Sequence, residues 1–190
     1  MVARMREAVK RIEGCREFAG IIPEVRTNLV YARHDAKTPA DVLAVDGRIT
    51  VVAGMPRAAG SVRFGASSHV ARLLLAVRGH DPSLRAAINF ASNPALEGWL
   101  PGYCKGRGWE LGLADRKNEP EEVRQTEGAS MRWKAEEAVR RAGGKVPKIV
   151  YDRGGWGKEP VSVIFGCEPD EVAGEACELA KRFAEARPRA

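Results

Sequence analysis

The turn at residues 65–69, with the sequence GASSH, is the clearest chemical signal in this 190-residue chain. Apolar residues at helical spacing follow it, from Val70 to Val77. The free N–H groups of a helix N-terminus bind phosphate, while glycine allows close backbone approach and serine hydroxyls add donors. Gly65, Ser67 and Ser68 are therefore predicted to hold a phosphate, with His69 facing it. An ordinary capped helix is the alternative.

A second glycine-rich segment, YDRGGWGKEP at residues 151–160, follows a short apolar run. Three glycines within four positions give a backbone that can approach a ligand closely, and Arg153 and Lys158 flank them. The spacing matches neither GxxxxGK[ST] nor GxGxxG, so neither of those nucleotide-binding loops is indicated. The segment is either a phosphate-binding loop or a tight turn between two strands, and composition alone leaves both open.

Three isolated polar residues also have suitable chemistry. Arg48 follows the turn signal at residues 46–47 and opens a strand, and its guanidinium can hold two phosphate oxygens at once. Asn28 begins one predicted strand and Asn89 ends another, where an amide could bind a pyrimidine edge or a phosphate. Each also has an ordinary interpretation, as a surface arginine or as a turn residue.

Composition narrows the class of protein. The net charge of +6 favours anionic partners, including phosphorylated metabolites, and the basic residues form no stripe typical of a nucleic-acid surface. The four cysteines include no CxxC pair, so their spacing does not indicate a zinc site. No apolar run reaches 18 residues, and the charged N-terminus lacks the apolar block of a secretory signal. We expect a cytoplasmic protein with neither membrane nor nucleic-acid partners.

Hydrophobic periodicity indicates an α/β domain with a mixed sheet covered on both faces. A proline and several glycines are expected to interrupt a helix that starts near Pro94, and residues 117–125 are expected to form a loop. Helices are predicted over residues 2–12, 70–77, 131–142 and 169–186, and strands over residues 28–32, 41–45, 49–52, 85–90, 109–113, 149–151 and 161–165.

Taken together, these motifs resemble one family, the ThiN domain of thiamine-phosphate synthases. The resemblance covers about residues 20 to 185 and is carried most specifically by FGASSH and YDRGGWGKEP. The further matching strings, in chain order around these two, are IIPEVRTNLVYA, DVLAVDGRI, DPSLRAAINF and EGASMRWKAEEAVRRAG. The family occurs in many archaea and some bacteria, often fused behind a hydroxymethylpyrimidine phosphate kinase.

The resemblance implies a fold and an activity. The fold would be a three-layer α/β/α domain over residues 1–190, with an N-terminal helix over residues 1–18 and a mixed, mostly antiparallel sheet, similar to class II aldolases and ribulose-phosphate epimerases. The activity would be the condensation of hydroxymethylpyrimidine diphosphate with hydroxyethylthiazole phosphate, which yields thiamine phosphate and diphosphate. Mg²⁺ is expected with the diphosphate substrate, and a homodimer is expected from the family pattern.

The resemblance also implies roles for the residues described above. Arg48 and His69 would act on the leaving diphosphate, and His69 could protonate it. The resemblance does not identify the metal ligands. Asp152 could line the substrate pocket or could instead hold Mg²⁺ through a water molecule. The residues expected to line the substrate pocket are Asn28, Gly65, Ser67, Ser68, Asn89, Asp152, Arg153, Gly154, Gly155 and Lys158.

Two other functions compete with the synthase. A regulatory module would bind thiamine phosphate without making it and would carry a DNA-binding unit ahead of the domain. About 20 residues precede the first motif, which is too short for such a unit, and both Arg48 and His69 are present. A metal-dependent aldolase would need clustered histidines, and His69 has no HxH partner.

Overall fold

The computed structural model describes residues 1–126, 128–155 and 159–187 and centres on one seven-stranded sheet. Within these residues only β7 and β8 pair in parallel, so the predicted mixed, mostly antiparallel sheet is confirmed. The strands, in their order across the sheet, are β5 (Val62–Phe64), β2 (Val42–Val45), β1 (Leu29–Ala32), β6 (Ala86–Ala91), β9 (Val161–Gly166), β8 (Ile149–Asp152) and β7 (Leu111–Ala114).

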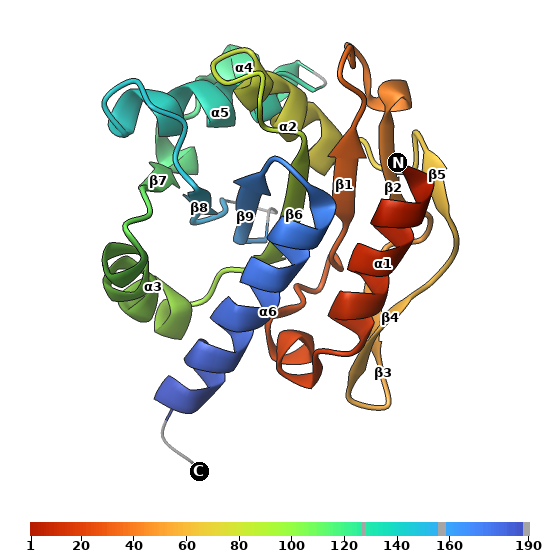
Figure 1. Ribbon diagram of the computed structural model, residues 1–190. Helices are drawn as coiled ribbons and strands as arrows, with labels where there is room; N and C mark the ends of the chain where they lie inside the picture. The colour runs from red at the N-terminus through yellow and green to blue at the C-terminus, as the bar shows by residue number, and fades with distance from the viewer. Residues whose placement is uncertain (127, 156–158, 188–190) are drawn as a thin grey trace.

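Helices cover both faces of the sheet, which gives three layers (Figure 1). Alternate residues of β1 show why: Leu29 and Tyr31 enter the core beneath one helix layer, while Val30 and Ala32 enter the core beneath the other. The first layer contains α1 (Val2–Glu13) and α6 (Pro169–Ala186), and the second contains α2 (His69–Arg78) and α5 (Ala129–Arg141).

The remaining elements depart from the sequence prediction at several points. The α-helix at the N-terminus ends at Glu13, short of the predicted residue 18, and the 3₁₀ helix η1 (Arg16–Ile21) follows it. Part of the predicted loop 117–125 is helical. The helical parts are η3 (Arg116–Asn118) and α4 (Glu121–Gln125). Earlier in the chain, η2 (Pro39–Asp41) precedes β2. Strands β3 (Ile49–Val52) and β4 (Met55–Ala58) form a hairpin that is separate from the main sheet.

The helix predicted to break near Pro101 is continuous as α3 (Pro94–Arg107). Asn93 caps it by accepting a hydrogen bond from the backbone N–H of Leu96 at 2.9 Å. Leu96, Leu100 and Cys104 form a buried stripe along the helix, while Pro101 is exposed. Burial of this stripe offsets the poor helix propensity of the proline and glycines.

Strand direction gathers Arg48, Asn28, Asn89 and Asp152 at one edge of the sheet, called here the site edge. Strands β2, β6, β7 and β8 run the same way, so their carboxyl ends meet there, together with the amino end of β1. Gly65 instead follows β5 at the opposite edge, where its N–H donates a hydrogen bond to the carbonyl oxygen of Val42 at 3.0 Å. At its C-terminal end, α2 is tied to the opposite edge, because Arg78 donates a hydrogen bond to the carbonyl oxygen of His34 at 2.6 Å. The N-terminus of α2 therefore points toward the site edge.

Candidate active site

His69 occupies the first turn of α2, where positive charges converge on its imidazole. Its Nδ1 lies 3.3 Å from the hydroxyl of Ser68, the N-cap residue, whose side chain does not cap the helix. Partial burial of the ring lowers the pKa of His69, and nearby cations lower it further. These cations, in decreasing order of effect, are Arg48, Arg72, Arg116 and Lys134. The imidazole of the free protein is therefore harder to protonate than that of an ordinary histidine.

Arg48 lies in a turn whose conformation is unusual for a residue with a side chain. Its φ is 71°, in the left-handed region, and Gly47 before it has a φ of 69°. Backbone hydrogen bonds hold the turn in place: Ile49 donates to the carbonyl oxygen of Thr27 at 2.7 Å, and Thr27 donates back at 3.0 Å. Such strained residues persist where surrounding contacts over-determine them, and they cluster at functional sites.

Residues 24–25 connect Arg48 to the end of the glycine-rich segment. The Arg48 guanidinium donates a hydrogen bond to the carbonyl oxygen of Val25. The carboxylate of Glu159 accepts hydrogen bonds from the backbone N–H of Glu24 at 2.8 Å and of Val25 at 2.9 Å. Two motifs separated by more than 100 residues thus meet on one piece of backbone. Sequence reasoning did not assign Glu159 a role, although its place after Lys158 in the KEP string was a usable signal.

A buried ion network lies where β7 and β8 end. One carboxylate oxygen of Asp152, Oδ2, lies 3.0 Å from Nε of Arg116 and 3.0 Å from Nζ of Lys134. The other, Oδ1, accepts a hydrogen bond from the backbone N–H of Gly154 at 2.8 Å. The side chains of Asp152, Arg116 and Lys134 are only 2%, 7% and 4% exposed. This network ties the start of the glycine-rich segment to η3 and α5.

Electrostatics within this network favour the charged carboxylate. Burial by itself would raise the pKa of Asp152, but the charges of Lys134 and Arg116 outweigh it and hold that pKa below its usual value. Burial lowers the pKa of Lys134, Arg116 lowers it further, and Asp152 opposes both. Glu119 also lies beside the Arg116 guanidinium at 3.3 Å, so the paired charges balance.

Sequence reasoning missed Arg116 and Lys134. A signal existed for Lys134, which falls three residues after Met131 and four before Ala138, within the buried stripe of α5. A lysine on the apolar side of a helix is seldom buried unless it is paired. The engagement of both Asp152 oxygens gives that residue a positioning part, and its predicted contact with substrate or Mg²⁺ stays a prediction.

Asn28 and Asn89 lie at the site edge but use their amides on the protein backbone. Asn28 accepts a hydrogen bond from the N–H of Val45 at 2.9 Å and donates to the carbonyl oxygen of Val45 at 3.1 Å. Asn89 accepts from the N–H of Asn28 at 2.7 Å and donates to the carbonyl oxygen of Arg26 at 3.0 Å. These bonds hold the backbone at Val45, before the Arg48 turn, and at residues 26–28, and the predicted substrate contacts stay predictions.

The other predicted residues fall into two places. Gly65, with a φ of 73°, and the half-buried Ser67 belong to the turn before α2. Arg153 is exposed and forms an ion pair with Glu97 of α3 at 2.5 Å. Gly154 is buried with a φ of 69°, Gly155 is exposed beside the Arg116 side chain, and Lys158 lies outside the described residues.

Two further searches of the described residues concern metal ligands and membrane-spanning helices. Within residues 1–126, 128–155 and 159–187, no three His, Cys, Asp or Glu side chains are grouped as metal ligands, which gives no support to an aldolase-type metal centre. In the same ranges no helix is long and apolar enough to cross a bilayer.

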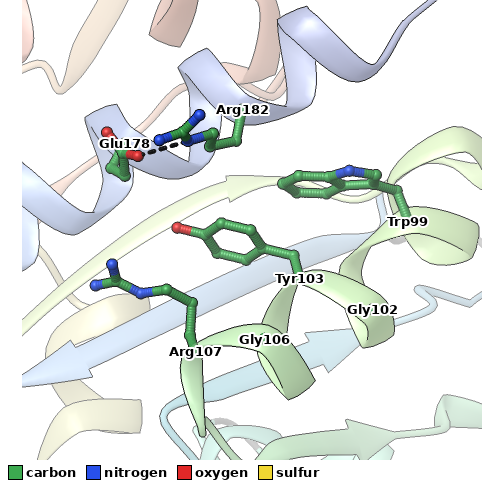
Figure 2. A pocket seen from close by; sticks show the side chains of 7 residues that line it. All are labelled: Trp99, Gly102, Tyr103, Gly106, Arg107, Glu178 and Arg182. Carbon is green, nitrogen blue, oxygen red and sulfur yellow. Dashed lines mark hydrogen bonds and ion pairs between the residues drawn. The ribbon is translucent and has the colours of Figure 1, made fainter.

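A separate pocket lies between α3 and α6 and contains none of the predicted site residues. Figure 2 shows Trp99 and Tyr103 on α3 facing Glu178 and Arg182 on α6. The rings of Trp99 and Tyr103, both on α3, stack with centroids 4.7 Å apart. The ring centroid of Trp99 also lies 5.3 Å from that of Phe183 on α6, so the segment rich in Gly, Trp and Pro builds an aromatic contact between two helices. Arg107 lies at the rim of this pocket.

The fold and the site together define an α/β/α domain of the class II aldolase type with several cationic side chains at one edge of its sheet. An L-fuculose-1-phosphate aldolase from Thermus thermophilus shares this fold, with a TM-score of 0.56 and 16% identity over 98% of this chain and 92% of that chain. The chain belongs to the thiamine-phosphate synthase ThiN family, whose profile matches residues 4–178.

Individual relatives agree with this family. The thiamine-phosphate synthase ThiN of Methanothermobacter thermautotrophicus is 38% identical over 96% of this chain and 93% of its own length. The bifunctional thiamine biosynthesis protein ThiDN of Methanocaldococcus jannaschii is 35% identical over 80% of this chain and 34% of its own length. A solved C-terminal domain of a phosphomethylpyrimidine kinase is 35% identical, with a TM-score of 0.88 over 94% of this chain and 97% of that domain.

Proposed function

We propose that this chain catalyses the alkyl transfer that joins hydroxymethylpyrimidine diphosphate to hydroxyethylthiazole phosphate, giving thiamine phosphate and diphosphate. ThiN proteins are thiamine-phosphate synthases, and 38% identity over nearly the whole chain supports a catalytic protein over a thiamine-phosphate-binding regulator. The observation that carries the catalytic assignment is the positive field at His69, to which the predicted partner Arg48 contributes the largest charge effect.

The chemistry needs charge stabilisation and alignment. The bond from the pyrimidine methylene carbon to the diphosphate oxygen breaks, and its electron pair leaves with the diphosphate. The thiazole nitrogen then forms the new bond to that carbon, and the electron pair comes from nitrogen. Preorganised donors that face the leaving oxygens lower the barrier to this step. Arg48 supplies a permanent charge, and the turn at Ser67 and Ser68 supplies backbone and hydroxyl donors. The N–H of Gly65 is already bonded to the carbonyl oxygen of Val42, so Gly65 contributes the bend that leads into this turn.

His69 is suited to respond to the substrate. In the free protein, partial burial and the neighbouring cations lower the pKa of the imidazole. A bound diphosphate reverses the sign of the local field, so the pKa of His69 rises and the ring takes up a proton. The imidazolium then donates to a leaving diphosphate oxygen, as a hydrogen bond or as a proton transfer.

Mg²⁺ is proposed to reach the site with the diphosphate. The carboxylate of Asp152 is already occupied by Arg116, Lys134 and Gly154. The described residues therefore do not fit a protein-bound metal centre, and no catalytic step is assigned to the ion. Mg²⁺ usually keeps several waters and binds substrate phosphates, which needs few protein ligands.

The expected setting of the enzyme also remains a proposal. We propose a cytoplasmic homodimer that binds small phosphorylated substrates, without nucleic acid or membrane partners. The family match and the absence of a spanning helix among the described helices are compatible with that setting.

The test is the reaction itself. Purified protein with Mg²⁺ and both substrates should form thiamine phosphate and diphosphate, and His69→Ala should lower kcat by about 10²–10⁴-fold. Circular dichroism should show that the variant is folded. A wild-type protein that binds thiamine phosphate but forms none would overturn the synthase and favour the regulatory module.

A further inference from the structure

Arg72 is a cation beside the site to which neither the motifs nor the mechanism above assign a role. It follows His69 by three residues in α2, so the two side chains are neighbours on one face of the helix. Long helical side chains lean toward the helix N-terminus, and this tendency favours a guanidinium directed toward the turn that precedes His69. The lowered pKa of His69, due first to partial burial and next to Arg48, also reflects the charge of Arg72.

Packing, rather than an ion pair, holds the Arg72 guanidinium in place. A Cβ atom added to Gly128 would lie 3.4 Å from Cζ of Arg72 and 3.5 Å from its Nε and Nη1. The guanidinium therefore rests against the residue that precedes α5. Gly128 has a φ of 79°, which glycine adopts without strain. Within the described parts of the chain, Arg72 forms no ion pair with a carboxylate.

Three basic residues near Arg72 already have acidic partners. Arg116 and Lys134 are bound to Asp152. Arg132 lines the same groove as Arg72, a cavity of about 540 Å³ along α2, but it pairs with Glu136 at 2.8 Å. A half-buried arginine without such a partner keeps its charge and its fork of donors available for an anion.

We propose that Arg72 binds the diphosphate of the pyrimidine substrate together with Arg48 and His69. This inference rests on the proposed function. A diphosphate carries more negative charge than one arginine balances, and an arginine on the same helix face as His69 supplies a second permanent cation. Because the arginine fork can hold two oxygens at once, lysine should replace it only in part.

Binding of inorganic pyrophosphate, measured by isothermal titration calorimetry with Mg²⁺ present, tests this proposal. Arg72→Ala should weaken binding by about tenfold or more, since a charge-assisted bidentate contact is lost. Arg72→Lys should lie between the alanine variant and the wild type. Arg132→Ala is the matched control, because it removes an equal charge from the same groove, and it should leave affinity within about twofold.

Two results would overturn the proposal: wild-type affinity in Arg72→Ala, or an equal loss in Arg132→Ala, which would indicate a general charge effect. If Arg72→Ala fails to fold, Arg72→Lys and Arg72→Gln decide instead, with the Gln variant expected to show the larger loss. Different results would refute the proposed synthase function and the proposed role of Arg72. A wild type that binds pyrophosphate through Arg72 yet makes no thiamine phosphate would refute the synthase alone, while unchanged KM values in an active Arg72→Ala enzyme would refute the role of Arg72.

Discussion

Two groups of cations act on His69, and they differ in burial and in partners. Arg116 and Lys134 are buried, and both lie 3.0 Å from the same carboxylate oxygen of Asp152. Arg48 is exposed and Arg72 half-buried, and within the described residues neither forms an ion pair with a carboxylate. Arg48 donates to a backbone carbonyl, and Arg72 packs against Gly128.

This difference separates positioning from binding. A buried, paired cation has its desolvation offset by its partner, and removal of one member leaves a costly unpaired charge. A cation without an acidic partner costs little to keep in water and can pair with an incoming anion. The buried group therefore shapes the glycine-rich segment, and the proposals above give the other group the contact with the substrate. Four predictions test this division.

The largest expected effect is on stability at Asp152. Asp152→Ala leaves Arg116 and Lys134 buried without their shared carboxylate, so the free energy of unfolding should fall by about 3–5 kcal/mol. Chemical denaturation of the purified protein measures it. As the control, Arg48→Ala should change stability by no more than about 0.5 kcal/mol, because its side chain is exposed. A small loss in Asp152→Ala would mean that the network contributes little to folding.

The second effect is on catalysis at Arg48. Arg48→Ala should lower kcat by about 10²–10³-fold, comparable to the removal of one preorganised donor to a developing negative charge. Steady-state assays with both substrates measure it. Arg153→Ala serves as the comparison, since Arg153 is already neutralised by Glu97 and a smaller loss is expected. Equal losses in the two variants would contradict the distinction between paired and unpaired cations.

A smaller effect is expected at Glu159, which joins the two motifs through residues 24–25. Glu159→Ala removes two charge-assisted hydrogen bonds from the backbone on which Arg48 rests, and kcat/KM should fall by about tenfold through misplacement of Arg48. Glu159→Gln keeps one acceptor oxygen and should recover part of the activity. If Glu159→Ala lowered stability without changing kcat/KM, the contact would be structural only.

The smallest effect is a change in the protonation of His69. The pKa of this imidazole in the free protein should lie below its ordinary value of about 6.5, and it should rise when inorganic pyrophosphate binds. NMR titration of the ring protons measures both states. Arg48→Ala should raise the pKa in the free protein, because a cation is removed. A ring whose pKa is unchanged by pyrophosphate would place the anion elsewhere.

The same lowered pKa has a consequence for folding. The unfolded chain binds a proton at His69 more readily than the native protein does. The contribution of His69 to the free energy of unfolding is therefore fully present above about pH 6.5. It decreases as the pH falls from that value toward the lowered native pKa. His69→Gln should show a weaker loss of stability over this window, which denaturation at several pH values measures.

Local patterns in the sequence were sufficient for much of the secondary structure. Apolar spacing places α2 and α6 nearly as observed, since a helix buries one face and needs a 3.6-residue period. The turn before His69 and the glycines at residues 154–155 were identified as phosphate candidates from glycine conformational freedom, helix-terminus N–H groups and nearby hydroxyl or basic side chains. The fourteen-residue α3 was expected to break, because local propensity cannot register the buried stripe that stabilises it.

Only the tertiary structure decided which polar groups are available to a ligand. Asp152, Asn28 and Asn89 have suitable chemistry in the sequence, but their side chains are engaged by partners up to 63 residues away along the chain. Sequence analysis assigned no role to Lys134 and Arg116, which the sheet order brings to one carboxylate. Residue type and spacing determine what a side chain can do, whereas pairing and burial depend on contacts between distant segments that only the folded chain makes.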